Sequence, residues 1–228
     1  MTRQLALALP HRTALGRSDF FVSDANRAAL AAIDGWRAWP DRRLALIGAE
    51  GAGKSHLAQV WVGAADAQLI PGTGIESADL PALTAAGCVA IDDADAVAGR
   101  PGAEQALFHL LNLCAAAGTC LLLTARSAPA RWPVGLPDLA SRLQAIPTAR
   151  LDPPDDALLG AVLVKLFADR QLRVDPELIG FLLRRMERSF AAARRLVARI
   201  DAMALAEGRR PARSLVARVL DSESGNAR

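Results

Sequence analysis

One stretch of the sequence has the residue types and spacing of a phosphate-binding loop. Residues 48–55, Gly-Ala-Glu-Gly-Ala-Gly-Lys-Ser, match the pattern GxxxxGKS between an apolar run and a helix-like segment. Glycines let consecutive main-chain N–H groups converge on phosphate oxygens, and the following helix N-terminus adds positive potential. We expect Lys54 to reach the terminal phosphates and the Ser55 hydroxyl to ligate Mg²⁺. The pattern predicts a nucleotide site, with a chance glycine-rich turn as the alternative.

Lysine is rare in this chain, so its position in the loop is informative. Of the 27 basic residues, only Lys54 and Lys165 are lysine, and all others are arginine. A compact ammonium and a forked guanidinium are not interchangeable at a phosphate, which favours a specific role for Lys54.

Two adjacent carboxylates follow another apolar run, residues 88–91. Because the carboxyl ends of parallel strands lie at the edge where nucleotides bind, Asp92 and Asp93 are candidates for the same site. We expect Asp92 to hold Mg²⁺ through water, and Asp93 to orient or deprotonate an attacking water. A pair of helix-capping aspartates, with Asp95 close by, is the alternative.

Apolar runs without polar alternation, separated by helical patterns, predict a parallel sheet covered on both faces. The expected strands are residues 44–47, 68–70, 88–91, 120–124 and 148–151. The helices expected between them are residues 24–37, with Asp24 as N-cap and Pro40 as a breaker, and residues 55–65, 104–117 and 138–145.

The sequence DPPDD at 152–156 marks a boundary, after which only helical patterns follow. These patterns are residues 155–171, 176–187, 189–207 and 212–221. We therefore expect four parts: a tail at 1–12, an α/β domain at 13–152, a helical domain at 153–222 and a second tail at 223–228.

Composition excludes several classes of protein. Hydrophobic residues make up 52% of the 228 residues, enough for a core, and no apolar stretch of about 18 residues predicts a membrane span. The apolar run near the N-terminus ends at Pro10 and is too short for a signal peptide, so a cytoplasmic location is expected. Three cysteines without CxxC spacing support neither a disulfide scaffold nor a zinc site.

Positive charge is concentrated in the last third of the chain. Residues 1–156 contain 13 basic and 16 acidic residues, whereas residues 157–228 contain 14 basic and 8 acidic residues. The basic part suits contact with phosphate or with an acidic protein, and a solvated helical surface is an equal alternative.

Together these features resemble the AAA+ nucleotide-binding module, in particular the branch of the bacterial replication initiator DnaA. The resemblance covers residues 18–221 and implies an α/β, AAA+ P-loop NTPase fold. That fold has a five-stranded parallel sheet flanked by helices, followed by a smaller all-helical lid domain. The resemblance rests on the phosphate loop, Asp92 and Asp93, the fourth apolar run ending at Thr124, the segment GLPDLASRL at 135–143 and the helical C-terminal part.

The resemblance implies an adenine nucleotide, ADP or ATP, bound with Mg²⁺. Thr124 matches a first sensor that positions the attacking water, and a strand-end hydroxyl bonded to backbone is an equal alternative. The position of the second-sensor arginine falls at Ala191, so Arg194, one turn further on, is the candidate substitute. The residues assigned to the nucleotide are Phe21 and Val22 beside the adenine, and Gly48, Glu50, Gly51, Ala52, Gly53, Lys54, Ser55, His56 and Arg194.

Arg142 matches the arginine finger of this family. The resemblance implies that its guanidinium enters a neighbouring subunit's site and stabilises charge on the transferring γ-phosphoryl group. A helix-surface ion pair with Asp138, four residues earlier, is the alternative.

The N-terminal sequence Gln4-Leu5-Ala6-Leu7-Ala8-Leu9 resembles the QLxLxL peptide by which relatives dock on the DNA sliding clamp. In an extended strand Leu5, Leu7 and Leu9 point to the same side, and the Gln4 amide can hydrogen-bond in a polar pocket. An edge strand or a fortuitous alternation is the alternative.

The helical patterns end near residue 221 without a helix-turn-helix domain, so we expect a short DnaA relative of the Hda type, a regulatory inactivator. The implied partners are the sliding clamp, DnaA-bound ATP, another copy of the chain, and DNA contacted mainly through the clamp. Two alternatives remain. One is an ATPase that loads or remodels another replication protein, with Asp93 catalytic in cis. The other is a nucleic-acid-binding module that uses the arginine-rich lid.

Overall fold

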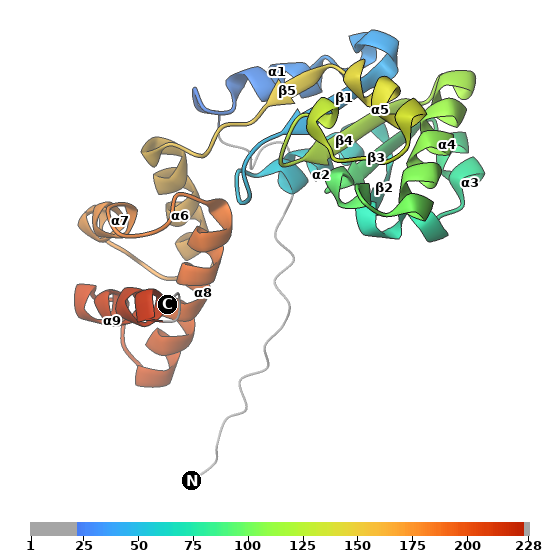
Figure 1. Ribbon diagram of the computed structural model, residues 1–228. Coiled ribbons are helices and arrows are strands. Elements are labelled where there is room, and N and C mark those ends of the chain that lie inside the picture. The colour runs from blue at the N-terminus through green and yellow to red at the C-terminus, as the bar shows by residue number, and fades with distance from the viewer. Residues whose placement is uncertain (1–21, 226–228) are drawn as a thin grey trace, which may run out of the picture.

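The computed structural model of the chain describes residues 22–225, with side chains to residue 222. Figure 1 shows a body built around a sheet and a separate group of helices that follows it in the chain. No helix within residues 22–225 is both long and apolar enough to cross a lipid bilayer.

The sheet has five strands, all parallel, in the order β2-β3-β4-β1-β5. This confirms the predicted fold class. Since β3, β4 and β1 are neighbours, the residues that follow them meet at one edge of the sheet. The strands are β1 (Arg43–Ile47), β2 (Gln68–Pro71), β3 (Cys88–Asp92), β4 (Cys120–Ala125) and β5 (Thr148–Arg150).

Helices cover both faces of the sheet (Figure 1), because successive strand residues point to opposite faces and both sets are apolar. One core contains Ala45 and Val89 together with residues of α3, α4 and α5, and the other contains Leu44 and Leu46 with residues of α1 and α2. The helices are α1 (Arg27–Asp34), α2 (Lys54–Ala65), α3 (Leu80–Ala85), α4 (Pro101–Ala117) and α5 (Pro137–Gln144).

The helices after residue 155 bury a core of their own. The Asp155 carboxylate caps α6 by accepting the N–H of Leu158 at 2.7 Å, and the Ser189 hydroxyl caps α8 by accepting the N–H of Ala192 at 3.1 Å. Gly208, with a φ of +61°, ends α8. These helices are α6 (Asp156–Asp169), α7 (Pro176–Leu183), α8 (Phe190–Glu207) and α9 (Arg213–Gly225).

The first helix is shorter than predicted, and the prediction that Asp24 caps it was wrong. Residues 23–26 form a turn instead, in which the N–H of Arg27 donates to the carbonyl of Ser23. Asn26 is therefore the N-cap of α1, while the Asp24 carboxylate pairs with Arg27 at 2.7 Å.

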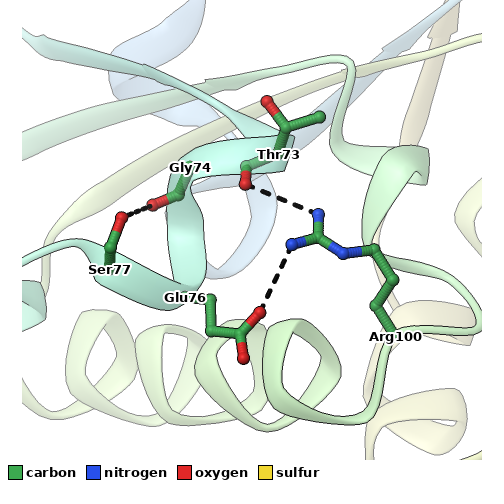
Figure 2. A network of polar contacts seen from close by, with 5 residues as sticks. All are labelled: Thr73, Gly74, Glu76, Ser77 and Arg100. Carbon is green, nitrogen blue, oxygen red and sulfur yellow. Dashed lines mark hydrogen bonds and ion pairs between the residues drawn. The ribbon is translucent and has the colours of Figure 1, made fainter.

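Two short elements after β2 were not predicted, because each is too short to show a helical period. They are the 3₁₀ segment η4 (Gly72–Ser77) and α3. Figure 2 shows how η4 is tied to the turn before α4: the Arg100 guanidinium donates to the Thr73 carbonyl at 3.5 Å and to the Glu76 carboxylate at 3.3 Å.

The three cysteines give a test of this core. Cys88, Cys114 and Cys120 are all free thiols and all buried. Burial raises the pKa of Cys88 and raises the pKa of Cys114 to about 11, so little thiolate forms at pH 8.

We predict that an aromatic disulfide reagent at pH 8 leaves all three thiols of the native chain unmodified for as long as the core stays closed. The same reagent should titrate three thiols in denaturant, as measured by absorbance. Rapid modification of even one thiol in the native chain would contradict the buried positions.

Candidate functional site

The loop between β1 and α2 requires glycine at three positions. Gly51 and Gly53 have φ values of +75° and +101°, a region that costs other residues roughly 1–2 kcal/mol. At Gly48 the difficulty is space, since a Cβ atom would collide with the carbonyl oxygen of Leu151. The glycines of the sequence motif are thus explained by backbone geometry.

Main-chain donors and one ammonium converge in this loop. Within residues 22–225, the N–H groups of Gly51, Gly53, Lys54 and Ser55 donate to no protein acceptor. The Lys54 side chain is only 6% exposed, and its Nζ donates to the carbonyl of Ala49 at 3.0 Å. An ammonium has three donors, so a buried one with a single carbonyl partner is incompletely satisfied. The loop therefore suits an anion such as the phosphates of a nucleotide.

The other residues of the loop lie around this candidate anion-binding site. Ala52 is buried beneath the loop, the Ser55 side chain is exposed at the start of α2, and His56 is half-buried in the same turn. The exposed Glu50 carboxylate pairs with Arg126, just beyond β4, at 2.9 Å. An exposed pair of this kind contributes little stability, typically below about 1 kcal/mol.

The ends of β3 and β4 are joined by the Thr124 hydroxyl. It donates to the Asp92 carboxylate at 2.5 Å and accepts the N–H of Asp93 at 2.9 Å. The bond to backbone was one of the two predicted alternatives, whereas the bond to Asp92 was not predicted. Because the Thr124 hydroxyl donates its proton to Asp92, it could form a hydrogen bond with a water molecule only as the acceptor.

Asp93 directly follows β3, which is separated by β4 from the strand that leads into the loop. It has a φ of +49° at the end of β3. Partial burial raises the pKa of its carboxyl, the nearby charge of Asp92 raises it further, and the charges of Lys54 and Arg126 oppose the shift. Asp93 therefore lies within electrostatic reach of Lys54, at the same edge of the sheet as the loop.

The protein side chains at this site are too few to bind Mg²⁺ alone, so the phosphates of a nucleotide would have to complete the ligand set. In the described part of the chain, no group of three His, Cys, Asp or Glu side chains could hold a metal ion. Mg²⁺ commonly takes one or two protein ligands and completes its shell with phosphates and water. Ser55 and Asp92 are the residues that would hold it here.

The helical part contacts the loop at the start of α8. The N–H of Phe190 donates to the carbonyl of Gly51 at 3.0 Å. A Cβ atom on Gly51 would collide with Ser189, and one on Gly53 would lie 2.9 Å from the Phe190 ring. Sequence reasoning missed both contacts, since Ser189 can be recognised as a helix cap but its approach to a distant loop cannot.

Arg194 lies one turn further along α8. Its side chain is exposed and forms no ion pair or hydrogen bond with another residue that the structure describes. The adjacent Arg195 pairs with Glu187 at 3.7 Å. The substitution of Arg194 for the second sensor therefore stays a prediction.

Several predicted residues cannot be placed here. Val22 is the first described residue, and its side chain is 65% exposed. The residues that lie outside the described range are Phe21 and the predicted clamp-binding residues Gln4, Leu5, Leu7 and Leu9.

Arg142 lies in the last turn of α5 and is half-buried. Its guanidinium carbon is 5.2 Å from the centroid of the Phe108 ring on α4, a cation–π contact. The alternative ion pair with Asp138 does not form among residues 22–225, so the charge of Arg142 has no carboxylate partner there.

No protein family model matches the sequence. The structure is similar to domain III of the Thermotoga maritima replication initiation protein DnaA, with a TM-score of 0.77 at 19% identity over 94% of this chain and 98% of that one. It is also similar to AMPPCP-bound DnaA from Aquifex aeolicus, with a TM-score of 0.64 at 17% identity over 78% and 62% of the two chains.

A third similar structure is the Thermotoga maritima RuvB Holliday junction branch migration motor. Its TM-score is 0.63 at 17% identity, over 87% of this chain and 66% of that one. At such identities the likeness establishes the fold, which is that of the AAA+ P-loop ATPases.

We predict that Lys54→Ala weakens ADP binding by roughly 10- to 100-fold, the value of one charge-assisted hydrogen bond. Fluorescence anisotropy of a labelled ADP measures this affinity. Lys165→Ala, which removes the other lysine of the chain, is the matched control and should bind normally. Equal affinity of the Lys54 variant and the native chain would contradict the assignment of the loop.

Proposed function

Because the chain has a DnaA-like AAA+ fold and a loop suited to phosphate, we propose that it is a nucleotide-binding regulator of chromosome replication initiation. It binds ADP or ATP with Mg²⁺, docks on the sliding clamp through residues 4–9, and presents Arg142 to ATP bound by DnaA. Hydrolysis then leaves DnaA in its ADP form and inactivates it. A cytoplasmic location is part of this proposal.

The observation that carries the proposal is the loop whose N–H groups have no acceptor in the described part of the chain, around a buried Lys54. A seat of this kind, at the end of the central strand β1 and beside Asp92, is suited to the phosphates of a nucleotide. The solved DnaA of similar fold is bound to AMPPCP, an adenine nucleotide analogue, which supports an adenine nucleotide here.

A role of Arg142 in a neighbouring site is supported by its surroundings. Its charge has no carboxylate partner within residues 22–225, and its guanidinium lies over the Phe108 ring of α4. An arginine supplied to a partner's γ-phosphate can raise the rate of hydrolysis about 10³- to 10⁵-fold.

DnaA is the favoured partner because the two folds are alike. Modules of one fold can associate head to tail, so that a surface of one subunit meets the nucleotide site of the next. A chain similar over 94% of its length to DnaA domain III could take the place of such a neighbour. Another copy of this chain is the remaining candidate for that position.

The clamp contact is supported by the sequence of residues 4–9. A short peptide binds weakly alone, but a second contact to DnaA on the same DNA would raise its effective concentration. DNA would then be approached mainly through the clamp.

A second function, an ATPase that loads or remodels another replication protein, is favoured by one observation. Asp93 lies close enough to Lys54 to feel its charge, as a base acting in cis would. Steady ATP turnover by the isolated chain, lost in Asp93→Asn, would support this function over the first.

We predict that Arg142→Ala abolishes the stimulated hydrolysis of DnaA-bound ATP, a loss of at least about 10³-fold, while ADP binding is unchanged. The measurement follows the ATP and ADP bound to DnaA in the presence of clamp-loaded DNA. Arg218→Ala, an exposed arginine on α9, is the control. Full stimulation by the Arg142 variant would refute the arginine-finger role.

We predict that changing Leu7 and Leu9 together to serine removes clamp binding, because in a peptide bound as an extended strand these side chains would lie on one side. The matched control changes Ala6 and Ala8 to serine on the opposite side and should bind normally. Retention of the chain on an immobilised clamp measures the difference. Equal retention of both double variants would argue against docking through this peptide.

A further inference from the structure

One buried carboxylate on α4 connects two separate loops. Glu104 lies in the first turn of α4 and is only 3% exposed. One of its oxygens accepts the N–H of Gly99 at 2.8 Å, and the other accepts the N–H groups of Gly135 and Leu136, both at 2.9 Å. Three main-chain donors therefore depend on a single side chain.

Two of these donors belong to the start of α5. The N-cap of α5 is Leu136, whose side chain cannot accept a hydrogen bond, and α5 begins at Pro137. Glu104 thus supplies from α4 the acceptor that a Ser or Asp cap would supply locally, and its negative charge suits a helix N-terminus. The position of α5 relative to α4 is fixed at this point.

Arg142 is carried by the same short helix. Its guanidinium faces the Phe108 ring, which lies one turn beyond Glu104 on α4. A shift at the start of α5 therefore moves Arg142 relative to the surface formed with α4. Misplacement of a catalytic group by about 1 Å can cost about 10²-fold in rate.

A second carboxylate holds the same turn from its outer side. Figure 2 shows Glu76 of η4 paired with Arg100, which directly precedes α4. The Glu76 side chain also lies against Gly102, where it would obstruct a Cβ atom. Glu76 resembles Glu104 in contacting the turn at 99–102, but it forms no hydrogen bond to α5, so it is a matched control.

We propose that Glu104 is a positioning residue for Arg142, acting through the two N–H groups that precede α5. This inference rests on the proposed function of Arg142 in a partner's site. Glu104 is buried and its oxygens accept three main-chain N–H groups, so we expect its effect to be on the placement of the guanidinium.

The test measures hydrolysis of DnaA-bound ATP against increasing concentrations of Glu104→Gln, Glu76→Gln, Arg142→Ala and the native chain, with clamp-loaded DNA. In Glu104→Gln an amide N–H₂ faces a main-chain N–H, so at least one of the three bonds is lost. The maximal stimulated rate should fall about tenfold or more, while the half-saturating concentration stays at the native value. A folding defect would instead lower the fraction of active protein. The half-saturating concentration would then rise, and the maximal stimulated rate would stay at the native value.

The Glu76 variant should keep the native maximum. Equal loss in both carboxylate variants, or a native maximum for Glu104→Gln, would overturn the inference. If Glu104→Gln does not fold, Glu104→Asp can be used, because it keeps the charge on a shorter side chain. This variant should show a smaller fall in the maximal stimulated rate. An unchanged maximal rate would again overturn the inference. Stimulation that survives Arg142→Ala would instead refute the proposed function itself, so the two failures are distinguishable.

Discussion

The main constraint at the end of the central strand β1 is a set of main-chain N–H groups that have no acceptor among residues 22–225. Buried or crowded donors without partners cost free energy, so folded proteins rarely keep them without a ligand. Here they occur where Gly51 and Gly53 adopt positive φ values and where the Lys54 ammonium has a single carbonyl partner. An anion bound in this loop would supply acceptors to these N–H groups and to the Lys54 ammonium.

Neighbouring elements bring further groups to the edge of the sheet where this loop lies. β3 and β4 bring Asp92 and Thr124 together by a hydrogen bond, and the start of α8 closes over Gly51. The helical part touches the loop itself, so a ligand bound in the loop would lie beside the start of α8. On the other face of the sheet, Glu104 links α4 to α5, so Arg142 is placed by the same body that holds the nucleotide.

Much of the sheet and the loop could be predicted from the sequence because their signals are local. Apolar runs identify the strands, and the glycines with Lys54 identify the loop. The N-cap of α1 was mispredicted because Asp24 and Asn26 are both good caps, and only the turn at Ser23 decides between them. Phe190 on Gly51 and Glu104 on Leu136 were not predictable, since each bond joins residues brought together only by the tertiary fold.

Binding of an adenine nucleotide's phosphates by this loop can be tested with a crystal structure of the chain in the presence of Mg²⁺ and ADP. We expect β-phosphate oxygens within hydrogen-bond distance of the N–H groups of Gly51 to Ser55, with the Lys54 ammonium turned from the Ala49 carbonyl toward them. A chain that takes up no ADP at millimolar concentration, or that binds it away from this loop, would rule out this role of the loop.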